Sequence, residues 1–141
     1  MENAPAFALD PRLAAGSDAV AALPLCHVRL KRDARFLWLL LVPERPGLAD
    51  LRDLAPDDRT RLWREILRAD AAVAALEEGG RRPDKVNVAL IGNVVRQMHV
   101  HVVGRFLNDP AWPGAVWHHG VGPERDPAAQ GRLIEGLRGR F

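Results

Sequence analysis

The alternation of apolar and polar residues predicts two neighbouring β-strands early in the chain. Residues 25–32 alternate, with Cys26, Val28 and Leu30 on one face and largely polar residues on the other, which is typical of a half-buried strand. Residues 36–43 (FLWLLLVP) form a continuous apolar run that ends at a proline, which indicates a more fully buried strand. Because only a short turn separates the two segments, we expect an antiparallel hairpin.

A helical pattern follows at residues 56–78. Pro56 suits the first position of a helix, and Asp57 and Asp58 place carboxylates in the first turn, where they interact favourably with the helix dipole. The pair Gly79–Gly80 is expected to end the helix. The apolar residues that recur at helical spacing are Leu62, Trp63, Ile66, Leu67, Val73 and Leu76.

The second half of the chain contains two more strand-like runs, at residues 86–91 and 96–106. The tail at 127–140 has a weaker helical pattern, because two internal glycines lower its helical propensity. The order strand, strand, helix, strand, strand with short connections indicates an α+β fold with an antiparallel sheet.

The length of 141 residues fits a single domain with a substantial core. We expect residues 25–106 to form that core, residues 1–24 to be loop with at most one short helix, and residues 107–141 to be a Trp/Pro/Gly-rich loop and tail. The composition, 48% apolar and 27% charged, is that of an ordinary soluble protein. The net charge is only +2 and the arginines are scattered, so no nucleic-acid partner is expected.

The cellular setting is suggested by what the sequence lacks. A single cysteine, Cys26, excludes an intramolecular disulfide and favours a reducing compartment. The N-terminus has no signal-peptide pattern, and the longest apolar run, Phe36–Val42, is too short to span a bilayer. We therefore expect a cytoplasmic protein with no membrane partner.

The segment at residues 96–106 combines polar and apolar residues in an unusual way. Because alternate side chains of a strand share a face, Gln97, His99 and His101 are predicted to project to one side. Met98, Val100 and Val102 would then face the core. Two histidines on one strand face are also compatible with a simple solvated surface, so the pair alone does not establish a site.

The residues before this strand favour a binding site. Gly92 lets a phosphate approach the backbone closely, and the N–H groups of a turn at Gly92–Asn93 can bind an anion. Asn87, on the preceding strand-like run, adds another amide if the two runs form a hairpin. A donor-rich site with two imidazoles suits a phosphate ester better than a divalent metal ion.

The segment GNVVRQMHVHVVGRF (92–106) resembles the signature of the histidine triad (HIT) family of nucleotide hydrolases and transferases. The family motif is His-φ-His-φ-His-φ-φ, where φ is apolar, and this chain reads Gln-Met-His-Val-His-Val-Val at 97–103. The runs LLLVP (39–43) and DPAWPGAVW (109–117) are also similar to family segments. The resemblance covers roughly residues 25–117 and implies an antiparallel sheet of about five strands, one main helix and a short C-terminal helix.

The resemblance also implies roles for individual residues. His99 corresponds to the nucleophile, His101 to the group that assists at the phosphate, and Gln97 to the first triad position. Gln97 can orient a neighbour by hydrogen bonding but cannot titrate. Many members carry a further histidine where this chain has Trp38, so a leaving-group acid is either missing or supplied elsewhere.

Four residues are implied to bind the nucleotide: the turn residues Gly92 and Asn93 at the phosphate, Asn87 at the phosphate or beside the nucleophile, and Asp33 at the ribose. The expected reaction is attack on the α-phosphate of a dinucleoside polyphosphate or a nucleoside phosphoramidate through a nucleotidyl-histidine intermediate. No cofactor is required, and Mg²⁺ is expected only as a nucleotide counter-ion. The family is commonly dimeric, and a sheet with open edges favours pairing, so we expect a homodimer.

Two alternatives remain open at this stage. The first is a nucleotide-binding protein of the same fold with little catalytic activity, which Gln97 and Trp38 would explain. The second is a metal protein in which His99, His101 and a loop histidine bind zinc.

Overall fold

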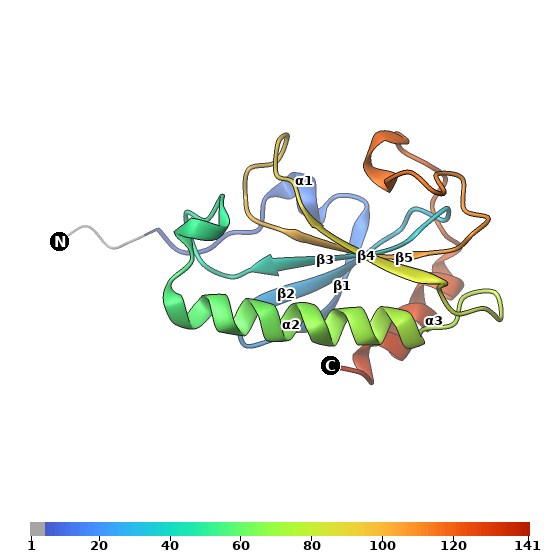
Figure 1. Cartoon of the computed structure of the whole chain (residues 1–141), viewed down its shortest axis with the longest axis horizontal. Coiled ribbons are helices and arrows are strands. Elements are labelled where there is room, and N and C mark those ends of the chain that lie inside the picture. The colour runs from blue at the N-terminus through green and yellow to red at the C-terminus, as the bar shows by residue number, and fades with distance from the viewer. Residues whose placement is uncertain (1–4) are drawn as a thin grey trace.

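The computed structural model describes residues 5–141 and contains one five-stranded antiparallel sheet of order β1-β2-β3-β5-β4 (Figure 1). The strands are β1 (Ser17–Ala22), β2 (Cys26–Lys31), β3 (Leu37–Pro43), β4 (Lys85–Leu90) and β5 (Val100–Arg105). The helices are α1 (Pro11–Ala14), α2 (Pro56–Ala75) and α3 (Pro127–Arg138), with 3₁₀ turns η1 (Leu51–Asp53) and η2 (Val116–His118). The expected α+β fold with a main helix and a short C-terminal helix is confirmed.

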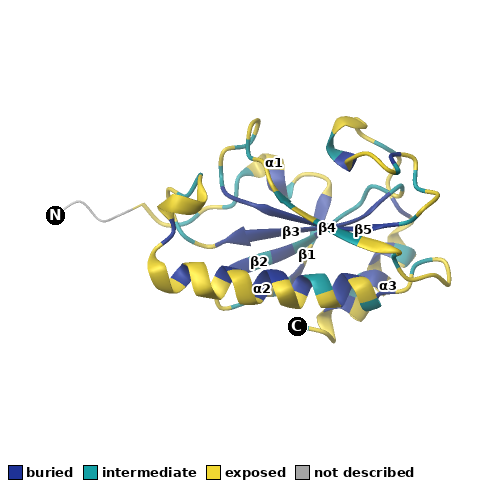
Figure 2. Cartoon of the chain, viewed as in Figure 1, coloured by how far each residue is buried: buried dark blue, intermediate teal, exposed yellow. Residues whose placement is uncertain are grey.

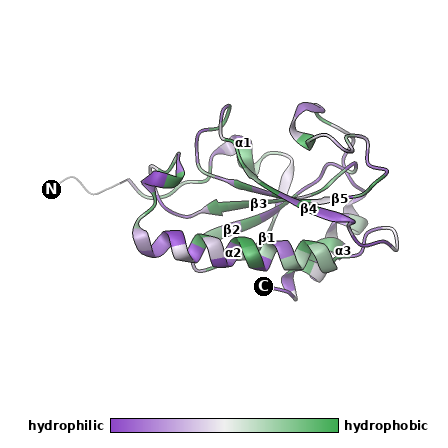
Figure 3. Cartoon of the chain, viewed as in Figure 1, coloured by the Kyte–Doolittle hydropathy of each residue, from purple (hydrophilic) through white to green (hydrophobic). Residues whose placement is uncertain are grey.

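The central strand β3 is apolar throughout because both of its faces are covered. All seven of its residues are buried. Leu37, Leu39 and Leu41 pack in the core on the α2 side of the sheet, whereas Trp38 and Leu40 pack in a second cluster on the other side. Figure 3 shows β3 as a hydrophobic strand in the middle of the molecule. The predicted hairpin of β2 and β3 is confirmed by their antiparallel register.

Strand β1 was not expected, since residues 1–24 were predicted to be loop with at most one short helix. The short helix exists as α1, but residues 17–22 pair antiparallel with β2, with a bulge between Ala19 and Ala21. The segment Ser-Asp-Ala-Val-Ala-Ala is poor in strand-forming residues, so its conformation depends on pairing with β2 rather than on its own propensity. Residues 1–4 of that prediction lie outside the described part.

Helix α2 is shorter than expected and exposes part of its apolar pattern. It ends at Ala75, three residues before the predicted end. Leu62, Ile66 and Val73 are buried against the sheet, but Trp63 and Leu67 are 60% and 50% exposed. Figure 2 shows the exposed outer side of α2 along its whole length.

The histidine segment is also less regular than expected. Strand β5 begins at Val100 rather than at residue 96, and the chain bends at residues 93–95 and at 97. Met98, Val100 and Val102 face the core on the α2 side, as the alternation predicted. Within residues 5–141, no helix combines the length and the apolar character that crossing a bilayer requires.

Candidate functional site

His99 and His101 line a cavity of about 360 Å³ on the sheet face away from α2. Its floor is formed by β2, β3 and β5, and its walls by α1, the loop at residues 91–95 and η2. In Figure 1, α1 and the chain around η2 lie on the side of the sheet opposite α2. The two imidazole rings meet edge to face with centroids 4.8 Å apart. The prediction that both histidines share a face is confirmed.

The proton arrangement on His99 follows from its backbone contact. Its Nδ1 atom lies 2.7 Å from the carbonyl oxygen of Gln97. A carbonyl can only accept, so Nδ1 carries the proton and Nε2 keeps a free lone pair. The side chain is held in a protein interior, with 7% of the residue exposed. This is the tautomer that a nucleophilic imidazole requires.

His101 has the opposite tautomer. The indole Nε1–H of Trp38 donates to His101 Nδ1 at 3.0 Å, so the proton of neutral His101 lies on Nε2. Burial first, and then electrostatic interaction with the neighbouring His99 and with Lys31, lower the pKa of His101 to about 3. His101 is therefore a neutral hydrogen-bond donor at physiological pH. Trp38 stands where many family members carry a histidine, and its N–H fixes the tautomer of His101.

The loop before the histidines reaches the same cavity. Gly92 and Asn93 both line it, together with Val94 and Val95, so the expected proximity of this loop to the histidines is confirmed. Gly92 has φ +64°, a conformation that residues with a Cβ rarely adopt. An added Cβ would also lie 3.4 Å from the carbonyl oxygen of Val95.

Gln97 does not place its side chain beside the histidines. Its Oε1 accepts from the backbone N–H of Asp10 at 2.8 Å, and its Nε2 donates to the carbonyl of Ala8 at 2.8 Å. The expectation that the Gln97 side chain orients His99 is therefore corrected. Its backbone carbonyl orients the imidazole, and its side chain fastens the N-terminal segment beside the cavity.

Asn87 and Asp33, the other two residues expected to contact the nucleotide, have side chains bonded to arginines. Asn87 is on the histidine face of β4, but its Oδ1 accepts from Arg105 Nη1 at 2.9 Å. Asp33 forms an ion pair with Arg35 at 2.7 Å. Neither residue lines the cavity. The Asn87 side chain is bonded to Arg105, within the segment 92–106, and the Asp33 side chain to Arg35, two residues further along the chain.

Arg105 and Asp109 form a buried ion pair that the sequence analysis missed. Arg105 is 1% exposed and donates to both carboxylate oxygens of Asp109, at 2.8 and 3.0 Å. Asp109 also accepts from the backbone N–H groups of Ala111 and Trp112. The pair thereby fixes the start of the loop that carries η2 to the cavity wall. The sequence signal for this pair was the spacing of four residues between Arg105 and Asp109, two residues of opposite charge.

The remaining aromatic and histidine residues of this loop differ in position. Trp117 is half-buried, with its ring centroid 5.4 Å from that of His101. His118 is exposed and lines the cavity, whereas His119 does not line it. Within residues 5–141, no three His, Cys, Asp or Glu side chains are grouped so that they could hold a metal ion. The third ligand of the zinc alternative is thus not supplied by these residues.

Comparisons with known proteins agree with the geometry. A family model described as the HIT domain matches residues 12–108. A histidine triad protein from Bradyrhizobium japonicum is 35% identical, with 96% of this chain and 98% of that chain covered and a TM-score of 0.90. A histidine triad (HIT) protein from Sinorhizobium meliloti 1021 is 33% identical, with 96% and 97% covered and a TM-score of 0.88. A histidine triad protein from Marinobacter aquaeolei VT8 is 32% identical, with 96% of both chains covered and a TM-score of 0.88. No functionally curated protein matches the sequence.

Proposed function

This chain belongs to the HIT domain family, and from that premise we propose that it is a nucleotide hydrolase or nucleotidyl transferase with His99 as its nucleophile. The observation that carries the proposal is the pair of opposite tautomers in one cavity. His99 presents a free Nε2 lone pair, and His101 presents an Nε2–H donor beside it. A phosphate between them would meet an attacking atom and a hydrogen-bond donor at once.

The reaction has two steps. The Nε2 atom of His99 attacks the α-phosphorus, a P–N bond forms, and the P–O or P–N bond to the leaving group breaks. Water then attacks the same phosphorus, the nucleoside monophosphate departs with the water oxygen, and His99 is regenerated. His101 Nε2–H and the backbone N–H groups near Gly92 and Asn93 donate to the phosphoryl oxygens as charge builds up. A Mg²⁺ ion enters only as a counter-ion of the nucleotide.

A nucleotide-binding protein with slow turnover is the second candidate. Two observations favour it: the first triad position, Gln97, cannot titrate, and its side chain is engaged with Ala8 and Asp10. The two functions are separated by measuring turnover with product identification and nucleotide affinity on one preparation. Release of a nucleoside monophosphate that is lost in His99→Ala supports the enzyme. Affinity without turnover supports the binding protein.

A suitable control uses another histidine of the same chain. His119 lies in the loop after η2 but does not line the cavity. His119→Ala should therefore keep normal turnover, whereas His99→Ala should abolish it and His101→Ala should reduce it. Equal losses in the three variants would indicate general destabilisation rather than the proposed roles.

We also propose that the chain forms a homodimer through α2 and β4. Strand β4 is an edge of the sheet, so among the described residues no further strand pairs with its outer side. Next to it, Trp63 and Leu67 of α2 and Leu90 of β4 expose large apolar side chains, by 60%, 50% and 38%. An apolar patch beside an open edge is typical of a surface that a second copy covers.

A further inference from the structure

Lys31 brings a positive charge to the cavity that no motif assigns. It is the last residue of β2 and lines the cavity together with Trp38 and the two histidines. Its Nζ atom lies 4.0 Å from the centroid of the Trp38 ring. The indole of Trp38 thus makes a cation–π contact with Lys31, and its N–H donates a hydrogen bond to His101.

The ammonium group of Lys31 is half-buried without a carboxylate partner. In the part of the chain that the structure describes, no Asp or Glu oxygen lies within 4.0 Å of its Nζ. The nearby carboxylate of Asp33 is itself paired with Arg35 at 2.7 Å. Burial lowers the pKa of Lys31, and the charge of Asp33 offsets this only in part. A partly desolvated cation of this kind is stabilised when an anion binds beside it.

The other cation of the cavity differs in this respect. Arg12 also lines it, but its guanidinium forms an ion pair with Asp10 at 2.9 Å. The end of β2 that carries Lys31 is in addition fixed in place, because the carbonyl of Lys31 accepts from Arg125 Nη1 at 3.1 Å. Lys31 is therefore the available positive charge, on a rigid strand end.

We propose that Lys31 forms a second anion subsite, which binds a phosphate of the leaving group beyond the phosphate attacked by His99. The proposal rests on the function proposed above and makes the substrate a phosphoanhydride. When His99 forms the P–N bond, the P–O bond breaks and the leaving group departs as a phosphate oxyanion. Its negative charge is neutralised by Lys31, so departure needs no proton.

The composition of the cavity wall agrees with an anionic leaving group. A phosphoramidate would expel an amine, which must take up a proton as the P–N bond breaks. Among the described residues, those that line the cavity include neither Asp nor Glu. His101 has its Nδ1 engaged by Trp38 and is neutral, so donating its Nε2 proton would leave an unfavourable anion. The buried part of the wall thus suits a leaving group that is stable as an oxyanion, and the exposed His118 is the one further imidazole of the lining that could protonate an amine.

The kinetic test compares two substrates that share the adenosine 5′-phosphoryl group. Diadenosine tetraphosphate has an anionic leaving group, and adenosine 5′-phosphoramidate has an amine. Lys31→Met keeps most of the length of the side chain and removes the charge. It should lower kcat/KM for the tetraphosphate about 10- to 100-fold, the range for a hydrogen bond to a charged group, and change the phosphoramidate little. Lys31→Arg should restore most of the loss.

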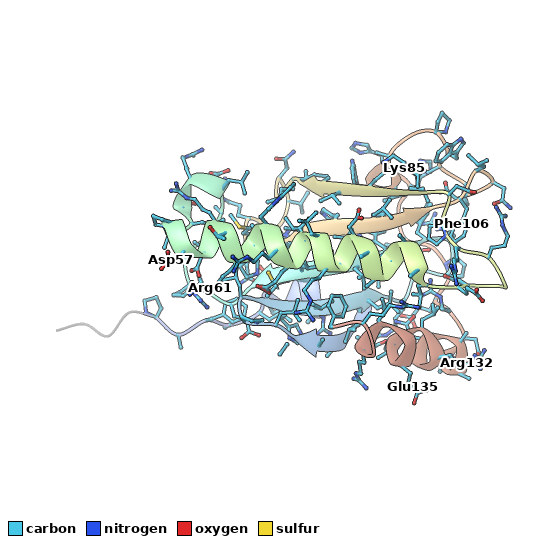
Figure 4. All side chains as sticks on the ribbon, turned by 60° about the horizontal axis from the view of Figure 1, so that its bottom comes forward. Asp57, Arg61, Lys85, Phe106, Arg132 and Glu135 are labelled. Carbon is cyan, nitrogen blue, oxygen red and sulfur yellow. The ribbon has the colours of Figure 1, made fainter. Side chains whose placement is uncertain are left out.

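The matched control is Lys85→Met, the only other lysine of the sequence. Lys85 is exposed on the edge strand β4, as Figure 4 shows, and its Nζ donates to the carbonyl of Val86. This variant should behave as the wild type with both substrates. An equal loss for the two substrates in Lys31→Met, or no loss for the tetraphosphate, would overturn the subsite.

A binding experiment tests the subsite independently of turnover. In the His99→Ala background, the affinities for ATP and AMP are measured by calorimetry with and without Lys31→Met. The preference for ATP over AMP should fall about 10-fold or more when Lys31 is replaced. An unchanged preference would refute the role of Lys31 even if the enzyme is active. Absence of turnover in the wild type with a Lys31-dependent ATP preference would instead refute only the proposed catalysis.

Discussion

Replacing Trp38 by Phe should change the protonation of His101 without removing either histidine. In the wild type, the indole N–H donates to His101 Nδ1 at 3.0 Å, and both side chains are buried. Phenylalanine keeps an aromatic ring in the second core cluster but has no donor. His101 Nδ1 is then left without its partner inside the protein, which costs about 1–3 kcal/mol of folding free energy.

The same substitution should alter the pH dependence of stability. The pKa of His101 is lowered to about 3 in the folded protein, first by burial and then by electrostatic interaction with His99 and Lys31. Because the pKa of His101 is lower in the folded protein, the unfolded chain takes up the proton first on acidification. The contribution of neutral His101 to the free energy of unfolding is therefore complete above about pH 6.5 and is lost as the pH falls toward 3. The bond from Trp38 can form only to the unprotonated Nδ1. Trp38→Phe should therefore raise the pKa of His101 and make this acid-induced loss shallower.

The assay is ¹⁵N NMR of the imidazoles combined with urea unfolding between pH 4 and pH 8. The wild type should show His101 protonated at Nε2 and His99 protonated at Nδ1, and Trp38→Phe should lose the fixed tautomer at His101 only. Trp63→Phe is the control, because that indole is 60% exposed on α2, on the other side of the sheet. A wild-type spectrum with the His101 proton on Nδ1, or an unchanged His101 tautomer in Trp38→Phe, would refute the reasoning.

Four further outcomes are expected. Gln97→Ala removes the hydrogen bonds to the N-terminal segment and should lower the free energy of unfolding by about 1–3 kcal/mol, as measured with urea. It should reduce turnover less than His101→Ala does. A loss of turnover as large as that of His99→Ala would contradict this. Gly92→Val should weaken nucleotide affinity in calorimetry while the fold is kept, because the φ of +64° disfavours a residue with a Cβ and the loop that lines the cavity must shift. Unchanged affinity in a folded variant would remove the phosphate-turn assignment. Arg105→Met should lower the free energy of unfolding by about 3–5 kcal/mol, because it leaves the Asp109 carboxylate buried without its cation. The control Arg52→Met removes an exposed ion pair and should lower it by less than about 1 kcal/mol. Equal shifts of the two unfolding midpoints would contradict the difference. Light scattering at micromolar concentration should give the mass of a dimer. Leu67→Glu places a charge on the exposed apolar patch and should shift the mass toward that of the monomer. A monomeric wild type would contradict the proposed interface.

The Arg105 prediction has a pH counterpart. Burial opposes ionisation of Asp109, but hydrogen bonds from Arg105 and from the backbone N–H groups of Ala111 and Phe106 outweigh it and lower its pKa. A carboxylate whose pKa is lowered in the folded protein stabilises the fold at pH values above its ordinary pKa, and this contribution is lost as the pH falls. The wild type should therefore lose stability on acidification below about pH 4, and Arg105→Met should lose less over the same range.

The sequence predicted those elements whose signal is local. The continuous apolar run of β3 and the alternation of β2 are decided by which faces are covered, and both were recognised. The end of α2 was placed too late, at the Gly79–Gly80 turn rather than at Ala75. Strand β1 was missed because Ser17–Ala22 has little strand propensity and is held by its partner strand.

The candidate site was predicted only as far as one strand determines it. Alternation places His99 and His101 together and the Gly92 loop near them, because these residues are close in the chain. The partners that set their chemistry are distant in sequence: Trp38 lies 63 positions from His101, and the Ala8 carbonyl lies 89 positions from Gln97. Such pairings depend on the register of neighbouring strands and on the path of the N-terminal segment, which residue periodicity does not contain.

The central claim is that His99 carries the nucleotidyl group during turnover. Rapid quench with a nucleotide labelled at the α-phosphate, followed by peptide mapping, tests it most directly. The account predicts base-stable, acid-labile label on the peptide that contains His99, with none in His99→Ala. Label on another residue, or near-normal turnover in a correctly folded His99→Ala variant, would contradict it.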